Sequence, residues 1–112
     1  MSKESELITL LSQRTKAGTQ SWEATAVDDE FVTVVADFSA FVRTAPSRDR
    51  DDPSPDVLFE VRDKEDRVIL SIRNGDSDIG VGFPQLRALH EDARRSALKI
   101  DRALDAILKS LK

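Results

Sequence analysis

The chain has 112 residues and a formal net charge of −4, and 39% of its side chains are hydrophobic. This length supports one domain with a modest core, and the apolar content is too high for a disordered chain. There is no cysteine and one histidine, which excludes disulfide frameworks, thiol catalysis and cysteine-based zinc sites.

The N-terminal segment is predicted to form a helix over residues 3–17. Leu7, Ile8 and Leu11 recur three and four positions apart, so they share one helical face. Gly18 follows as the residue expected to end the helix in a left-handed conformation.

Three strands are predicted next, at residues 20–27, 31–36 and 38–44. Alternating or β-branched apolar residues indicate strands, and the short turns between them indicate antiparallel pairing. Trp22, the only tryptophan, lies on the first strand. We expect it to anchor the core, with exposure at a partner surface as the alternative.

Residues 45–56 hold three of the four prolines and five consecutive charged residues. Proline removes the donors that a sheet needs, and nothing apolar here offsets the entropy cost of ordering. We therefore expect a mobile loop that separates strands within one domain spanning residues 1–112.

A hairpin is predicted after the loop, with strands at 57–62 and 67–73. Residues 63–66 turn the chain. Strict alternation in the second strand places Val68, Leu70 and Ile72 on one face.

The longest helical pattern covers residues 84–111. Its apolar stripe consists of Leu86, Leu89, Ala93, Ala97, Ile100, Leu104, Ile107 and Leu111. One continuous helix of this length would measure roughly 40 Å, longer than a typical strand of about 17–20 Å. Part of the stripe should therefore extend beyond the sheet. The predicted fold is α+β: an N-terminal helix, an antiparallel sheet of about five strands in meander order, and a long C-terminal helix packed on the sheet.

No motif of catalysis, metal binding or cofactor binding is complete. His90 has Arg94 where a zinc protease motif needs a second histidine. Residues 74–78 resemble the start of a calcium loop but lack its later glycine and glutamate. The glycines at 80–84 match neither phosphate-binding pattern, so a hinge is the better interpretation. We predict no enzyme activity, no cofactor and no metal.

Charge is distributed unevenly along the chain. Residues 23–66 contain 13 acids and 5 bases, a net charge of −8, whereas residues 84–112 contain 7 bases and 4 acids, a net charge of +3. Contacts to phosphate would come from Arg87, Arg94, Arg95, Lys99 and Arg102. The acidic sheet and the lack of interleaved aromatic residues argue against nucleic acid as the main partner.

Two segments together resemble a group of small uncharacterised bacterial proteins. These are the Trp-Glu-Ala-Thr sequence at 22–25 and the helical sequences at 89–101 and 103–108. The hairpin at 59–72 fits the same order, while the loop at 45–56 departs from it. The resemblance implies a bacterial, cytoplasmic, compact protein, and it implies no established activity.

The leading hypothesis is a non-catalytic protein-interaction module that uses the C-terminal helix or a sheet edge. A homodimer is the simplest form, because a two-fold contact needs one self-complementary patch. The predicted contact residues are Trp22, Phe83, Leu89, Ala93, Ala97, Ile100, Leu104, Ile107 and Leu111.

Two alternatives remain open at this point. One is a nucleic-acid accessory protein that uses the basic strip, and the other is a carrier of a small ligand in an apolar pocket. No apolar run approaches the roughly 18 residues of a membrane span, so no membrane association is expected.

Overall fold

The computed structural model describes residues 3–47, 51, 54–74 and 83–112, and only the backbone of Phe83. In chain order its elements are α1 (Lys3–Lys16), β1 (Glu23–Ala24), β2 (Phe31–Val35), β3 (Phe38–Ala45), β4 (Asp56–Arg62), β5 (Val68–Arg73), α2 (Phe83–Ala97) and α3 (Ile100–Leu111). The predicted α+β class is confirmed.

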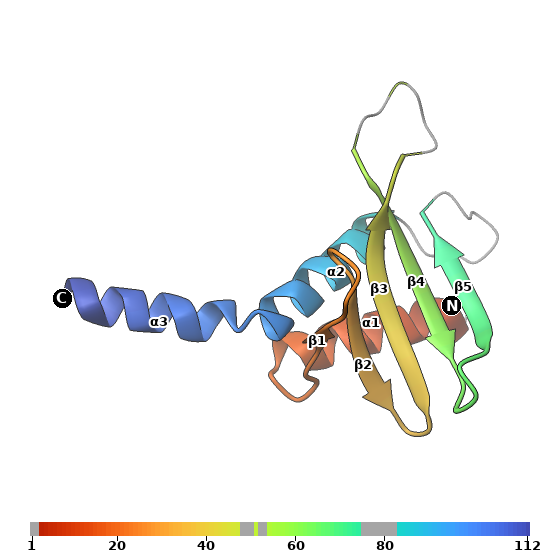
Figure 1. Cartoon of the computed structure of the whole chain (residues 1–112), viewed down its shortest axis with the longest axis horizontal. Helices are drawn as coiled ribbons and strands as arrows, with labels where there is room; N and C mark the ends of the chain where they lie inside the picture. Colours follow the sequence, from red (N-terminus) through yellow and green to blue (C-terminus); the bar gives the residue numbers. More distant parts are fainter. Residues whose placement is uncertain (1–2, 48–50, 52–53, 75–82) are drawn as a thin grey trace.

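The five strands form one antiparallel sheet in the order β1-β2-β3-β4-β5, which confirms the predicted meander (Figure 1). Phe31 lies opposite Val42, Val42 opposite Phe59, and Phe59 opposite Ile72, so one apolar row crosses the sheet. The first strand is much shorter than the one predicted at 20–27.

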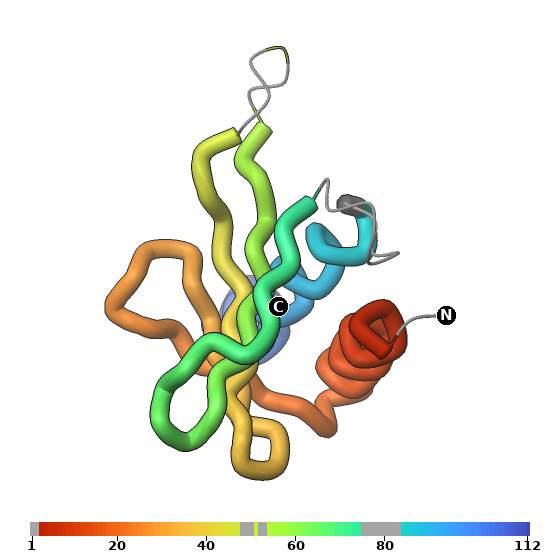
Figure 2. Tube along the Cα trace, turned by 90° about the vertical axis from the view of Figure 1, so that its right-hand side faces the viewer, coloured from red at the N-terminus to blue at the C-terminus, as the bar shows by residue number. Residues whose placement is uncertain are grey.

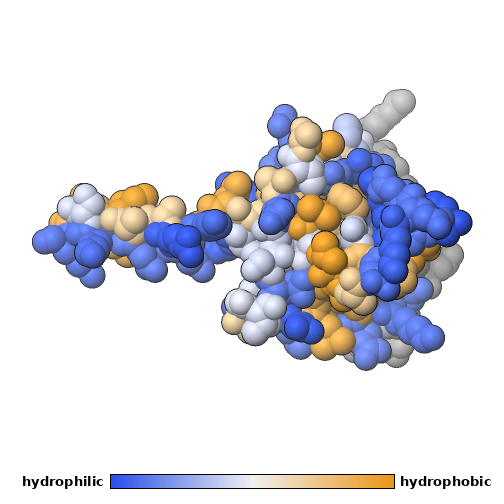
Figure 3. All heavy atoms as spheres, turned by 60° about the horizontal axis from the view of Figure 1, so that its bottom comes forward, coloured by the Kyte–Doolittle hydropathy of each residue, from blue (hydrophilic) through white to orange (hydrophobic). Residues whose placement is uncertain are grey.

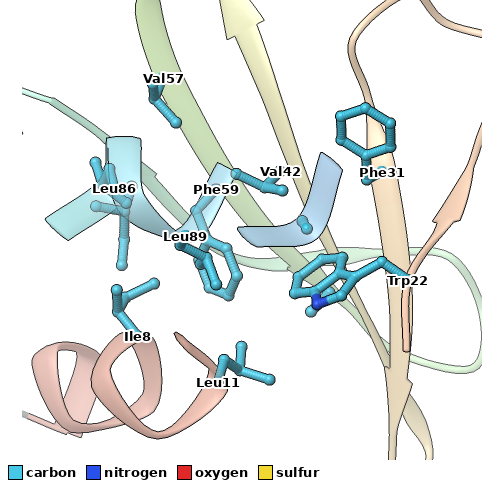
Figure 4. Packing of buried hydrophobic residues seen from close by; sticks show 12 residues of the cluster. Ile8, Leu11, Trp22, Phe31, Val42, Val57, Phe59, Leu86 and Leu89 are labelled. Atoms are coloured by element: carbon cyan, nitrogen blue, oxygen red, sulfur yellow. The ribbon is translucent and has the colours of Figure 1, made fainter. Parts of the chain in front are cut away.

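Helices α1 and α2 cover the same face of the sheet (Figure 2). Their apolar residues and the inner face of the sheet form one buried cluster (Figure 4). The largest fully buried side chains are Phe59, Ile8, Ile72, Leu86, Leu89 and Val42. Because burial of apolar area is the main favourable term in folding, α2 is a core helix.

Helix α1 begins and ends close to the predicted bounds. Ile8 and Leu11 are buried and Leu7 is partly buried against the core, as the spacing predicted. Gly18 has φ 78°, the left-handed conformation that glycine adopts without steric cost. Leu10 lies off this face and is exposed.

Trp22 joins both helices to the sheet. Its indole Nε1 donates a hydrogen bond to Thr15 Oγ1 of α1 over 2.9 Å, and its backbone N–H donates to Ser96 Oγ of α2 over 3.0 Å. The side chain is buried. Trp22 is thus a core anchor, and its predicted alternative role at a partner surface is wrong for this chain.

The loop predicted at 45–56 is shorter than expected, because β3 and β4 extend into it. Ala45 pairs with Asp56 at the end of the sheet. The buried Asp56 carboxylate accepts hydrogen bonds from Arg73 Nε over 2.7 Å and from Asn74 Nδ2 over 3.1 Å. The predicted mobility falls mainly on residues 48–50 and 52–53, which lie outside the described residues.

The turn between β4 and β5 is closed by Asp63. Its Oδ1 accepts hydrogen bonds from the backbone N–H groups of Arg67, over 3.0 Å, and Glu65, over 2.9 Å. The backbone hydrogen bond from Arg67, together with the other contacts in the turn, holds the pKa of Asp63 below its ordinary value.

An NMR titration of the Asp63 carboxyl should therefore give a midpoint below that of an unfolded aspartate. A lowered folded-state pKa contributes stability above the unfolded pKa, and this contribution is lost as pH falls through the folded value. Arg67→Ala keeps the backbone N–H and should preserve much of the shift. A midpoint at or above the ordinary value would contradict the turn geometry.

Strand β5 does not alternate as predicted. Val61 pairs with Leu70 while Arg62 pairs with Val68, so Ile69 is an extra residue in a β-bulge. A bulge re-aims side chains. Here Ile69 and Leu70 both line one apolar groove, and Val68 is exposed. The prediction that Val68, Leu70 and Ile72 share one face is therefore wrong for Val68.

The continuous helix predicted at 84–111 is also wrong, because the chain breaks between α2 and α3. Lys99 adopts the left-handed conformation, with φ 53° and ψ 44°. Leu98 N–H still bonds to the Arg94 carbonyl over 2.9 Å, whereas Lys99 N–H bonds to the Ser96 carbonyl over 3.2 Å, which tightens the last turn. The break sends α3 away from the body (Figure 1).

The broken form makes a contact that a straight helix lacks. Arg95 forms an ion pair with Asp101 across the break. On a straight helix these residues would lie about 120° apart around the axis and six residues apart along it, roughly 9 Å. A left-handed residue other than glycine costs roughly 1–2 kcal/mol. The ion pair and the Trp22 hydrogen bond to Ser96 favour ending α2 here.

Candidate interaction surfaces

The apolar face of α3 is exposed from Leu104 to Leu111. Leu104, Ile107, Leu108 and Leu111 are 46%, 55%, 51% and 79% exposed, and no α3 side chain is buried. Figure 3 shows hydrophobic side chains gathered on one side of the projecting helix. Isolated helices shorter than about 12–15 residues are marginally stable in water. Helix α3 therefore gains stability from any surface that covers this face.

A second apolar surface lies on the inner face of the sheet beside α1. It is a groove of about 270 Å³ with a wholly apolar lining. We call it the sheet groove, and its main residues are Leu7, Leu11, Val35, Phe38, Val61 and Ile69.

The rim of the sheet groove faces solvent. Val35, Phe38 and Ile69 are 37%, 41% and 55% exposed. Figure 3 looks toward the end of the sheet where β2 turns into β3 and shows a hydrophobic patch on the body there. Neither α1 nor α2 covers this end of the inner face, so the groove is open.

The break divides the predicted contact residues into two groups. Leu89 and Ala93 are fully buried in the core, which corrects their assignment to an interaction surface. Ala97 is partly buried against the core, and Ile100 is half-buried at the start of α3. The side chain of Phe83 lies outside the described residues. Of the predicted set, the described residues at the surface are Leu104, Ile107 and Leu111.

The break at Lys99 also divides the predicted basic strip, because Arg87, Arg94 and Arg95 lie on α2 and Arg102 lies on α3. Arg94 forms an ion pair with Glu91 over 3.7 Å, and Arg95 pairs with Asp101. These carboxylates reduce the positive potential that a phosphate backbone would need. Arg87 lies separately near the start of α2.

A cavity of about 480 Å³, lined mostly by polar and charged residues, lies where α1 ends and α2 meets α3. Three of the predicted basic residues line it. Asp92 also lines the cavity, and its carboxylate accepts a hydrogen bond from Ser12 Oγ over 2.7 Å. Lys16 lies 3.8 Å from the same carboxylate. The three predicted residues are Arg95, Lys99 and Arg102.

The outer face of the sheet carries charged groups that pair with one another. Arg43 lies 3.6 Å from both Glu30 and Glu60. Arg62 pairs with Glu60 over 3.1 Å and stacks over the Phe41 ring at 4.3 Å. An antiparallel sheet commonly leaves one face in water. This pattern is typical of a solvated face.

His90 packs against the fold and joins no catalytic group among the residues placed by the structure. Its Nε2–H donates a hydrogen bond to the Asp29 carbonyl oxygen over 2.9 Å, and its ring centroid lies 5.5 Å from that of Phe31. Within the described ranges, no three or more histidine and carboxylate side chains form a group that could hold a metal ion.

The alternative of an apolar pocket named no residues, and the residues of the sheet groove were not predicted from the sequence. The groove arises where α1 crosses the sheet and leaves the end at the β2–β3 turn uncovered, and the bulge at Ile69 completes its rim. Periodicity shows which residues share a face of one element, and it does not show where another element leaves that face uncovered.

Among the helices in the described part of the chain, none is long and apolar enough to cross a membrane. Comparisons with protein-family models, with curated proteins and with solved structures found no match. The resemblance to small bacterial proteins stays a prediction.

Proposed function

We propose that this chain is a non-catalytic protein-interaction module and that α3 is its docking element. The observation that carries the proposal is the uncovered apolar face of α3, formed by Leu104, Ile107, Leu108 and Leu111. Helix α3 is too short to be stable by intrinsic propensity alone. A partner that buries this face would supply the missing stabilisation.

The proposed partner is a second copy of the chain. Residues 99–112 contain four bases and two acids, a net charge of +2, in a chain whose net charge is −4. The rest of the chain therefore has a net charge of −6, so α3 of one copy is attracted to the body of another. A two-fold dimer satisfies both copies with the same contact. From the resemblance to small bacterial proteins, we further propose that the protein is bacterial and cytoplasmic.

Sedimentation equilibrium tests the proposal on the full chain. We expect a dimer at micromolar concentrations for the wild type. Triple substitution of the apolar face to alanine, at Leu104, Ile107 and Leu111, should weaken dimerisation by more than about 100-fold. The reason is that burying one such side chain contributes roughly 1.5–3 kcal/mol, and 1.4 kcal/mol is a factor of ten.

The matched control replaces three exposed residues outside the apolar face of α3 by alanine, namely Arg102, Asp105 and Ser110, so that the net charge of residues 99–112 stays at +2. It introduces the same number of alanines, which favour helix, and should leave the dimer intact. A monomeric wild type at high micromolar concentration would refute the proposal, as would an apolar-face variant that dimerises like the wild type.

A further inference from the structure

We infer that α3 of one copy binds in the sheet groove of a second copy, and that the second α3 binds reciprocally in the first groove. This inference rests on the proposed self-association and specifies the surface that receives α3. The chain carries both halves of such a contact: an amphipathic helix whose apolar face is uncovered, and an open groove with a wholly apolar lining.

The donor side of the contact is held away from its own groove. Lys99 in the left-handed conformation and the Arg95–Asp101 ion pair direct α3 outward from the end of α2 (Figure 1). The sheet groove of the same chain lies beside α1, at the end of the sheet where β2 turns into β3. A groove on a second copy is therefore the available site for α3 in this conformation.

Charge at the groove complements charge on α3. Asp37 and the turn at residues 63–67 stand at this end of the sheet and together carry four acids and two bases, a net charge of −2. The segment at 99–112 has a net charge of +2. Pairing α3 with α3 would bring like net charges together, whereas pairing α3 with the groove brings opposite charges together.

The groove also suits aliphatic side chains better than an enclosed small molecule. Its volume of about 270 Å³ is below the roughly 300–1,000 Å³ of typical small-molecule pockets, and its lining exposes no polar surface to orient a ligand. Leucine and isoleucine side chains spaced along one helix face need only apolar contact. Docking of α3 would cover Val35, Phe38 and Ile69 at the rim.

Adjacent residues of β2 provide a matched pair of variants. Val35 lines the groove, whereas Val34 lines no part of it and is 67% exposed. Val35→Lys places a positive charge where α3 would bind, and it should raise the dimer dissociation constant at least tenfold. Val34→Lys adds the same charge on the other side of the strand and should leave the constant unchanged. Circular dichroism confirms that each variant is folded.

Disulfide capture locates the contact directly, because the chain has no cysteine of its own. Ile107→Cys and Ile69→Cys variants, mixed and oxidised, should give a covalent dimer seen by intact mass. Two control mixtures each move one thiol off the proposed contact. One combines Asp105→Cys with Ile69→Cys, and the other combines Ile107→Cys with Ser71→Cys. The expected yield in the first mixture is at least tenfold higher than in either control.

The outcomes separate this inference from the proposed function. If Ile107→Cys alone crosslinks as well as the mixture does, α3 pairs with α3, so the groove is not the site and the interaction module stands. If the wild type is a dimer but the cysteine variants do not crosslink at the groove and Val35→Lys does not weaken the dimer, the groove is also overturned. A monomeric wild type overturns the proposed function itself, whereas groove crosslinking together with weakening by Val35→Lys supports both.

Discussion

Leu89→Ala is expected to lower the free energy of unfolding by about 2–5 kcal/mol, the cost of truncating a buried leucine. Leu89 is fully buried in α2 and lies against Phe59 in the core (Figure 4). Removal of its side chain leaves a cavity between the helix layer and the sheet. Urea denaturation followed by far-UV circular dichroism measures this change.

The matched control for this prediction is Leu104→Ala on the same predicted stripe. Leu104 is 46% exposed, so under dilute conditions that keep the chain monomeric its truncation should change the free energy of unfolding by less than about 0.5 kcal/mol. Equal effects of Leu89→Ala and Leu104→Ala would show that α3 packs on the body, which contradicts the break at Lys99.

Trp22→Ala should cost about 3–5 kcal/mol, because the indole fills the junction between α1, α2 and the sheet. Part of this cost belongs to its hydrogen bond with Thr15. Thr15→Val keeps the shape of the threonine side chain and leaves the buried indole N–H without this acceptor, at a cost of about 1–3 kcal/mol. Chemical denaturation followed by circular dichroism gives both values.

Trp22→Phe is the control that separates packing from hydrogen bonding at this site. It keeps an aromatic ring in the core and removes the indole N–H together with its need for an acceptor. Its effect should fall well below that of Trp22→Ala. A Trp22→Ala variant within 1 kcal/mol of the wild type by the same measurement would refute the anchoring role.

Sequence patterns predicted the meander and α1 because both depend on local rules. Short turns force neighbouring strands to pair, and the spacing of Ile8 and Leu11 fixes the buried face of α1. Register follows from the same logic, since a slip by one residue would expose the row that contains Val42 and Phe59.

The break at Lys99 could not be predicted from these rules. Residues 96–100 contain neither glycine nor proline, and alanine, leucine and lysine are good helix formers. The contacts that accompany the break are tertiary: Ser96 accepts a hydrogen bond from Trp22, which is far away in sequence, and Arg95 reaches Asp101 only in the bent form. The prediction of one long helix over residues 84–111 is therefore wrong, and the apolar residues expected to extend beyond the sheet are exposed on a separate helix, α3.

The sheet groove was missed for a similar reason. Val35 and Phe38 look like ordinary strand residues, and the bulge at Ile69 has no glycine to indicate it. The groove exists because α1 crosses the sheet at one place and leaves another open. That crossing position depends on the whole packing arrangement, which no single segment encodes.

Apart from the half-buried Ile100, no side chain of α3 is covered by the body, so substitutions in α3 and substitutions in the core should act largely independently. If α3 is the docking element that we propose, substitutions in α3 should change the choice of partner at little cost to folding, and substitutions in the core should change thermal stability without altering partner binding. The left-handed residue at position 99 marks the boundary between these two parts. On the proposed function, grafting a different amphipathic helix after that residue should direct the protein to a different partner while keeping the same scaffold.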